Sequence, residues 1–205
     1  MKCYICHAME TMENVKPLLE YIRKHVTLTE EEEAYLCSQI ALRKYLKGQY
    51  ILQQGDISSI QCFILSGCTK MFYVDDAGQE HVIMFSIEEW WTSDLGSFAT
   101  QTPSDFNVQC IEPTTVIQFP YETHENLLQR IPKLERFFRK IIEKAYVSSQ
   151  KRIIRNLSLS AKERYQLFHL KYPHIEQRIP QYMLASYLGI TKEFLSKIKK
   201  EVLQQ

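Results

Sequence analysis

The sequence QYMLASYLGITKEFLSKIK, residues 181–199, decides how the C-terminal part of this chain folds. Its apolar residues predict two short helices that meet at Gly189, where the missing side chain permits the left-handed backbone of a tight turn. Ala185 is small enough to let the two helices approach closely. The positions that we expect to be buried are Leu184, Ala185, Leu188, Ile190, Leu195 and Ile198. This spacing is typical of a helix-turn-helix.

The same spacing turns polar residues of the second helix outward. Thr191 is placed to cap that helix with its hydroxyl and to meet a phosphate. We expect base edges in the major groove of DNA to be read by Lys192, Glu193 and Lys197. Lys199 and Lys200 are expected to neutralise phosphates. The predicted DNA-contacting residues are Thr191, Lys192, Glu193, Ser196, Lys197, Lys199 and Lys200. An ordinary helical hairpin that closes a small core is the alternative.

The charge of the chain is divided unevenly along its length. Residues 1–132 hold nine Lys/Arg and eighteen Asp/Glu, which gives −9, and residues 133–205 hold sixteen and six, which gives +10. A concentrated basic region favours nucleic acid as a partner, although a solvated helical surface also accumulates Lys and Arg. The sequence contains no apolar run long enough to span a membrane and no signal peptide, so we expect a cytoplasmic protein without a membrane partner.

The N-terminal part predicts helices followed by many short strands. Residues 9–46 read as helical, with a second helix that starts at the capping box Thr29–Glu32 and runs towards Tyr45. Short apolar runs broken by glycine and acidic turns then predict a small β barrel or roll over residues 49–120. The candidate strands are Gln49–Gln53, Cys62–Leu65, Thr69–Val74, His81–Phe85, Phe106–Ile111 and Thr115–Phe119.

Helical periodicity returns after Pro120, with a short helix over Tyr121–Arg130 and a long one that Pro132 opens. The long helix carries an apolar seam, which predicts that a second copy of the chain packs against it in a homodimer. The seam consists of Leu134, Phe138, Ile141 and Ala145.

Over residues 15–200 the chain resembles the Crp/Fnr family of bacterial transcription regulators. The resemblance rests on Gly48, Gly55-Asp56 and Gly67, on the long helix, and on the run Thr191–Lys197, in which lysines stand for the family's two arginines and Glu193 is kept. It implies an α+β fold with a cyclic-nucleotide-binding-like β-roll as sensor domain over residues 1–131, a dimerisation helix over 132–157 and a helix-turn-helix domain over 158–205. Since few residues follow the recognition helix, we expect this domain to lack the family's usual β-hairpin wing.

The family's nucleotide site combines an acid for the ribose with an arginine for the cyclic phosphate. Asp94 could stand where the acid stands, but Asp105 lies near the place of the arginine, and Lys70 is the only cationic residue between Lys47 and Arg130. We therefore expect an unknown small-molecule effector rather than cyclic AMP bound in the usual way. The candidate pocket residues are Trp91, Asp94 and Ser104.

The remaining residues predict neither a metal site nor an enzyme. Six cysteines are present, and Cys3-x-x-Cys6 is the only close pair with ligand-like spacing. We expect no cofactor and no catalysis, with double-stranded DNA and a second copy as partners and RNA polymerase as a further one. Two alternatives stay open: a redox-sensing regulator with an iron–sulfur cluster, and a β-roll module that acts through protein contacts and carries a degenerate helix-turn-helix.

Overall fold

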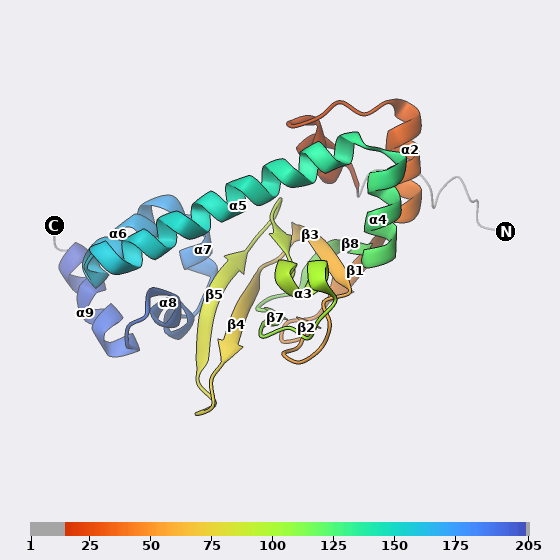
Figure 1. Cartoon of the computed structure of the whole chain (residues 1–205). Helices are drawn as coiled ribbons and strands as arrows, with labels where there is room; N and C mark the ends of the chain where they lie inside the picture. Colours follow the sequence, from red (N-terminus) through yellow and green to blue (C-terminus); the bar gives the residue numbers. More distant parts are fainter. Residues whose placement is uncertain (1–14, 204–205) are drawn as a thin grey trace.

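The computed structural model describes residues 15–203, which form an α+β fold with eight strands among these residues. Figure 1 shows the β-roll on one side of a long helix and a cluster of short helices at that helix's far end. The strands are β1 (Ala41–Tyr45), β2 (Tyr50–Leu52), β3 (Ile60–Ser66), β4 (Thr69–Val74), β5 (Glu80–Ser86), β6 (Trp91–Thr92), β7 (Asn107–Cys110) and β8 (Thr114–Pro120).

Two four-stranded antiparallel sheets make up the roll, in the orders β1-β8-β3-β6 and β2-β7-β4-β5. The predicted hairpin joins β4 to β5, and the Asp75 carboxylate holds its turn by accepting hydrogen bonds from the N–H groups of Ala77 and Gln79. Gly67 is required between β3 and β4, because its φ is 105° and a Cβ there would lie 2.5 Å from the Thr114 hydroxyl. The predicted β-roll is therefore confirmed.

Helices occur before, within and after the roll. Residues 15–23 are helical, and the other helices are α2 (Glu30–Gln39), α3 (Leu95–Thr100), α4 (Tyr121–Arg130), α5 (Lys133–Ser158), α6 (Ala161–Lys171), α7 (Pro173–Arg178), α8 (Gln181–Leu188) and α9 (Lys192–Leu203). The helices predicted over 121–130 and from Pro132 onward are confirmed as α4 and α5, and the capping box at Thr29 opens α2.

The prediction that the second helix continues towards Tyr45 is wrong. The helix ends at Gln39, and residues 41–45 form strand β1, which pairs antiparallel with β8. Periodicity alone could not show that this segment is a strand, because almost all of its residues are exposed. Its conformation depends instead on pairing with β8, about 70 residues later in the chain.

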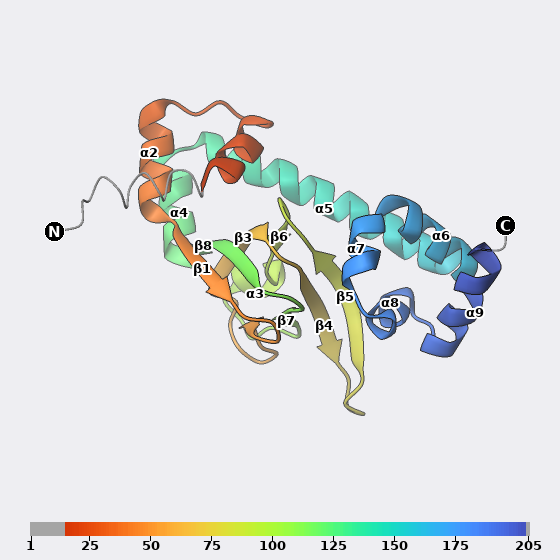
Figure 2. The ribbon, with the colours of Figure 1, turned by 180° about the vertical axis from the view of Figure 1, so that it is seen from behind.

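One core joins the roll to the helices on either side of it. Buried residues of the N-terminal helix, of β3 and β8 and of α4 pack against the start of α5; the largest of them are Leu18, Ile22, Phe63, Ile117, Phe119, Leu127, Leu134 and Phe137. Figure 2 shows α5 leaving this core and running to the C-terminal helices. None of the helices among residues 15–203 is both long and apolar enough to cross a membrane.

Candidate functional site

The helix-turn-helix consists of α8 and α9, and its turn has the predicted geometry. Gly189 ends α8 in the left-handed conformation, with φ 67° and ψ 38°, and the N–H of Ile190 donates to the carbonyl of Ala185. The expected buried positions are confirmed, with Ile190 only partly buried and Leu184, Ala185, Leu188, Leu195 and Ile198 at most 5% exposed.

Five of the predicted DNA-contacting side chains are exposed, and the other two, Ser196 and Lys199, are half-buried. The Thr191 hydroxyl accepts a hydrogen bond from the N–H of Phe194 and so caps α9, as expected. Ser196 is half-buried, and its hydroxyl lies 3.4 Å from the Gln181 side-chain oxygen. The exposed members are Thr191, Lys192, Glu193, Lys197 and Lys200. Together these five side chains form a polar face of α9 that is accessible to a large ligand.

Lys199 forms an ion pair within its own domain. Its ammonium lies 2.8 Å from the Glu176 carboxylate of α7, which also bonds His169 and Tyr165. Burial alone would raise the pKa of Glu176, but the hydrogen bonds from Lys199, His169 and Tyr165 outweigh burial and lower it. Lys199 is therefore held on the inner side of α9, where it anchors the helix.

The helix-turn-helix is docked on the sensor through α8. Strand β5 is an edge of its sheet, and the Ser186 hydroxyl occupies that edge by accepting from the N–H of Val82 and donating to the carbonyl of Glu80, at 2.9 and 2.8 Å. The Arg152 guanidinium of α5 donates to the carbonyls of Ile83 in β5 and Tyr187 in α8. It thus links the long helix to both the roll and the helix-turn-helix. Figures 1 and 2 both show α8 beside β5.

Charged and aromatic contacts extend this docking. Arg178 at the end of α7 forms ion pairs with Glu88 and Glu112 of the sensor. These bonds raise the pKa of Arg178; burial would raise the pKa of Glu88, but the bonds from Arg178 lower it instead. Two aromatic pairs lie beside them, Phe85 with Tyr187 and Trp90 with Tyr172, at centroid distances of 5.5 and 5.8 Å. Sequence reasoning missed this interface, since nothing local marks contacts between residues that are 66 to 106 positions apart.

The seam predicted on the long helix is covered by its own protomer. Leu134 and Phe138 are 1% and 6% exposed in the sensor core, and Ile141 packs against that core. Only Ala145 of the predicted seam is exposed. The seam is apolar and mostly buried, as expected, but the sequence does not show that the surface which buries it belongs to the same protomer.

A different apolar face of α5 is exposed. Tyr146 and Ile153 are seven residues apart and are 63% and 58% exposed, and Val147 and Ile154 repeat the spacing. With Ile142 and Leu157 they form one side of the helix, which we call the α5 stripe. The seven-residue spacing in the sequence is the signal that could have revealed it.

The three candidate pocket residues have different neighbours. The Asp94 carboxylate accepts from the N–H groups of Gly96 and Ser97, which caps α3, and from the Ser104 hydroxyl at 2.7 Å. Trp91 instead lies among aromatic rings of the sensor core, with centroids of Phe119 and Phe138 at 5.2 and 5.3 Å. Asp94 and Ser104 thus hold the loop around α3, and Trp91 connects the roll to α5.

The lysine of the roll is already neutralised. The Lys70 side chain is 3% exposed and forms an ion pair with Glu80, and its ammonium lies 4.0 Å from the centroid of the Phe72 ring. A phosphate would have to displace Glu80 to reach this cation, because a carboxylate and a phosphate compete for the same donor.

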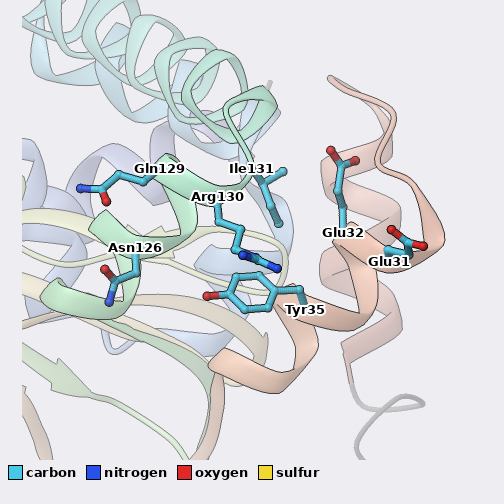
Figure 3. Close-up of a pocket in the computed structure, with 7 residues that line it drawn as sticks. All are labelled: Glu31, Glu32, Tyr35, Asn126, Gln129, Arg130 and Ile131. Carbon is cyan, nitrogen blue, oxygen red and sulfur yellow. The ribbon is translucent and has the colours of Figure 1, made fainter.

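A pocket of about 570 Å³ lies between α2 and α4, where it is lined by Glu31, Glu32, Tyr35, Asn126, Gln129, Arg130 and Ile131 (Figure 3). The Arg130 guanidinium stacks over the Tyr35 ring at 5.0 Å, and Glu32 is engaged with Lys133 and with the cap of α2. None of the predicted effector residues lines this pocket.

Burial raises the pKa of the Cys62, Cys68 and Cys110 thiols, to about 12 for Cys68, which favours the neutral form of each. No group of three His, Cys, Asp or Glu within residues 15–203 could hold a metal ion. Cys3 and Cys6 lie outside the described residues.

Comparison with known proteins points to one family. The model of the cyclic nucleotide-binding domain matches residues 42–131. The transcriptional activator protein Anr of Pseudomonas aeruginosa is 25% identical over 167 residues, 76% of this chain and 68% of that protein, and the anaerobic regulatory protein of Haemophilus influenzae is 25% identical over 84% of this chain and 71% of that protein. Among solved structures, FixK2 of Bradyrhizobium japonicum matches with a TM-score of 0.72 at 14% identity, over 81% of this chain and 85% of that one.

Proposed function

Because the chain belongs to the Crp/Fnr family of transcription regulators, we propose that it binds double-stranded DNA as a homodimer, with α9 in the major groove. The exposed polar face of α9 carries this proposal. Lys192, Glu193 and Lys197 project from it, in the first half of the helix, which is the part of a recognition helix that contacts base edges. Lys200 would contact phosphate, while Lys199 supports the domain through Glu176.

The proposed dimer forms through the α5 stripe. Six large apolar residues on one side of a 26-residue helix are costly in water, and their seven-residue spacing suits a second α5 packed against the first. A second copy related by a two-fold axis would place two α9 helices about one turn of DNA apart. The preferred operator is then an inverted repeat, at which RNA polymerase is a further partner.

The proposed sensor role does not include cyclic AMP in the family's usual way. The roll between Gly48 and Gln129 carries no arginine, and its single lysine is paired with Glu80. Trp91, Asp94 and Ser104 remain candidate effector residues, and the contact of Trp91 with Phe138 gives the roll a route to α5. Calorimetry that detects micromolar cyclic AMP binding dependent on Asp94 would refute this part of the proposal.

A selection from random double-stranded DNA tests the proposed function. The full chain should enrich an inverted repeat, and its affinity should fall steeply as salt rises, because released counterions accompany each neutralised phosphate. A library from which the chain enriches no sequence, with retention insensitive to salt, would contradict the proposal and favour a module that acts through protein contacts.

A redox-sensing form of the same regulator is the second candidate, and the spacing Cys3-x-x-Cys6 favours it. A cluster needs converging thiolates, whereas burial keeps Cys62, Cys68 and Cys110 protonated. We therefore expect a colourless protein. Visible absorbance with stoichiometric iron after purification without oxygen would establish the redox-sensing form.

A further inference from the structure

Phe194 is an aromatic residue exposed on the first turn of α9. It is 47% exposed, although the next residue, Leu195, and Ile198 one turn later are at most 2% exposed in the domain core. Its N–H donates to the Thr191 hydroxyl at 3.2 Å, so the helix cap fixes the backbone from which the ring projects. The ring is therefore held in a defined place without being absorbed by the core.

The position of Phe194 borders the polar face of the helix. Residues three apart are neighbours on a helix surface, so Phe194 adjoins Lys197, and it directly follows Glu193 in the chain. Both neighbours are exposed. The first two turns of α9 thus expose a carboxylate, an apolar ring and a cation, with the ring next to the cation.

These three groups differ in the bases that they can recognise. Lysine donates to guanine and glutamate accepts from cytosine, whereas neither suits the C5-methyl group of thymine, the apolar feature of the major groove. We propose that the Phe194 ring contacts a thymine methyl in each half-site and selects thymine at that position. This inference rests on the proposed function, because it requires α9 to enter the major groove.

The test couples one side chain to one methyl group. Starting from the selected operator, each thymine of a half-site is replaced in turn by deoxyuridine, which lacks only the C5-methyl. At one position the replacement should weaken binding of the unaltered chain by about fourfold, the effect of exposing one carbon group. Binding of Phe194→Ala should be weakened by less than about 1.5-fold at the same position, because the contact is already gone.

Two controls separate this contact from general damage. Phe194→Leu keeps an apolar side chain and should retain most of the sensitivity to the methyl. Leu170→Ala truncates another exposed apolar residue of the same domain, 77% exposed on α6, and should retain it fully. Thermal unfolding of each variant verifies the fold.

The outcomes distinguish the inference from its premise. Loss of the methyl effect in Phe194→Ala alone supports the contact. If an operator is selected but the deoxyuridine effects are the same in Phe194→Ala and in the unaltered chain, the Phe194 contact is wrong and the proposed function stands. If no operator is selected at all, both are wrong.

Discussion

Glu193 and Lys200 lie on the same exposed face of α9, yet they should contribute to DNA binding in different ways. A carboxylate gains only where a base offers a donor, whereas an ammonium near the backbone interacts with every sequence.

Glu193→Ala should therefore relax the preference at one base pair per half-site by about tenfold, because it removes a base-specific hydrogen bond. Lys200→Ala should weaken all sequences alike and reduce the steepness of the salt dependence. Binding titrations on an operator and its single-base variants measure both effects. Equal losses on every sequence for both variants would show that Glu193 does not read a base.

We expect His124 to make the stability of the fold depend on pH. His124 is 8% exposed, its Nε2 is buried with no hydrogen-bond partner among residues 15–203, and the ring centroid lies 4.6 Å from that of Phe138. Burial lowers the pKa of His124, and the bond with Glu125 offsets this only in part.

Because the folded state binds the proton less readily than the unfolded one, the contribution of His124 is fully present above about pH 6.5 and is lost as the pH falls below it. His124→Leu should flatten the stability profile between pH 7.5 and pH 5.5. Urea unfolding at both values measures this, and an unchanged difference between the two pH values in the variant would assign the pH dependence to other groups.

Helix α5 has two apolar faces. The first face, around Leu134 and Phe138, is buried against the roll, and the α5 stripe is exposed; the proposed dimer would cover it with a second copy. The sequence predicted the helix and an apolar seam, but periodicity reveals that a residue is covered and does not reveal by what; in the protomer Leu134, Phe138 and Ile141 pack against the core of the roll.

Ile153→Asp should weaken the dimer by at least about tenfold while it leaves the protomer folded, because an aspartate in the α5 stripe would bury an uncompensated charge only in the dimer. Ile141→Asp is the matched comparison and should destabilise the protomer itself, since Ile141 packs against the sensor core. Sedimentation equilibrium and thermal unfolding measure the two properties. A dimer constant unaffected by Ile153→Asp would place the interface elsewhere.

Strand β1 and helix α4 mark what local sequence can and cannot determine. The α4 bounds follow from Pro120 and from a clear helical period, and they were predicted to the residue. Residues 41–45 carry no such signal, and only their pairing with β8 makes them a strand. The exposed side of α9 was predictable for the same reason as α4, because the short spacing around Gly189 determines which residues of α9 are buried.

Within the whole molecule, α8 of the helix-turn-helix is docked on β5 of the roll, so the proposed DNA-binding part and the roll are in direct contact. Pairing over long sequence distances produces this interface, so it could not be predicted from the sequence. Its charged part is the contact of Arg178 with Glu88 and Glu112.

Arg178→Gln should lower the free energy of unfolding by about 1–2 kcal/mol and speed hydrogen exchange in α8, because it removes charge-assisted bonds that are partly shielded from water. Arg139→Gln removes an exposed pair with Glu143 and should change stability much less, because water and salt screen an exposed pair. The Arg178 effect should be fully present above about pH 4.5, the ordinary pKa of a glutamate, and should be lost as the pH falls through the lowered pKa of Glu88. Equal exchange in both variants would show that Arg178 does not hold the domains together.

The proposed dimer inserts two α9 helices into the major groove on the same side of the DNA, so its affinity should depend on the spacing of the half-sites. The full chain is titrated against the selected inverted repeat and against the same repeat lengthened at its centre by about five base pairs, half a helical turn. Affinity for the lengthened repeat should fall to that for a single half-site, because the second α9 then faces the wrong side of the duplex. Equal affinity for the two repeats would show that the two helices do not bind one face of the DNA together.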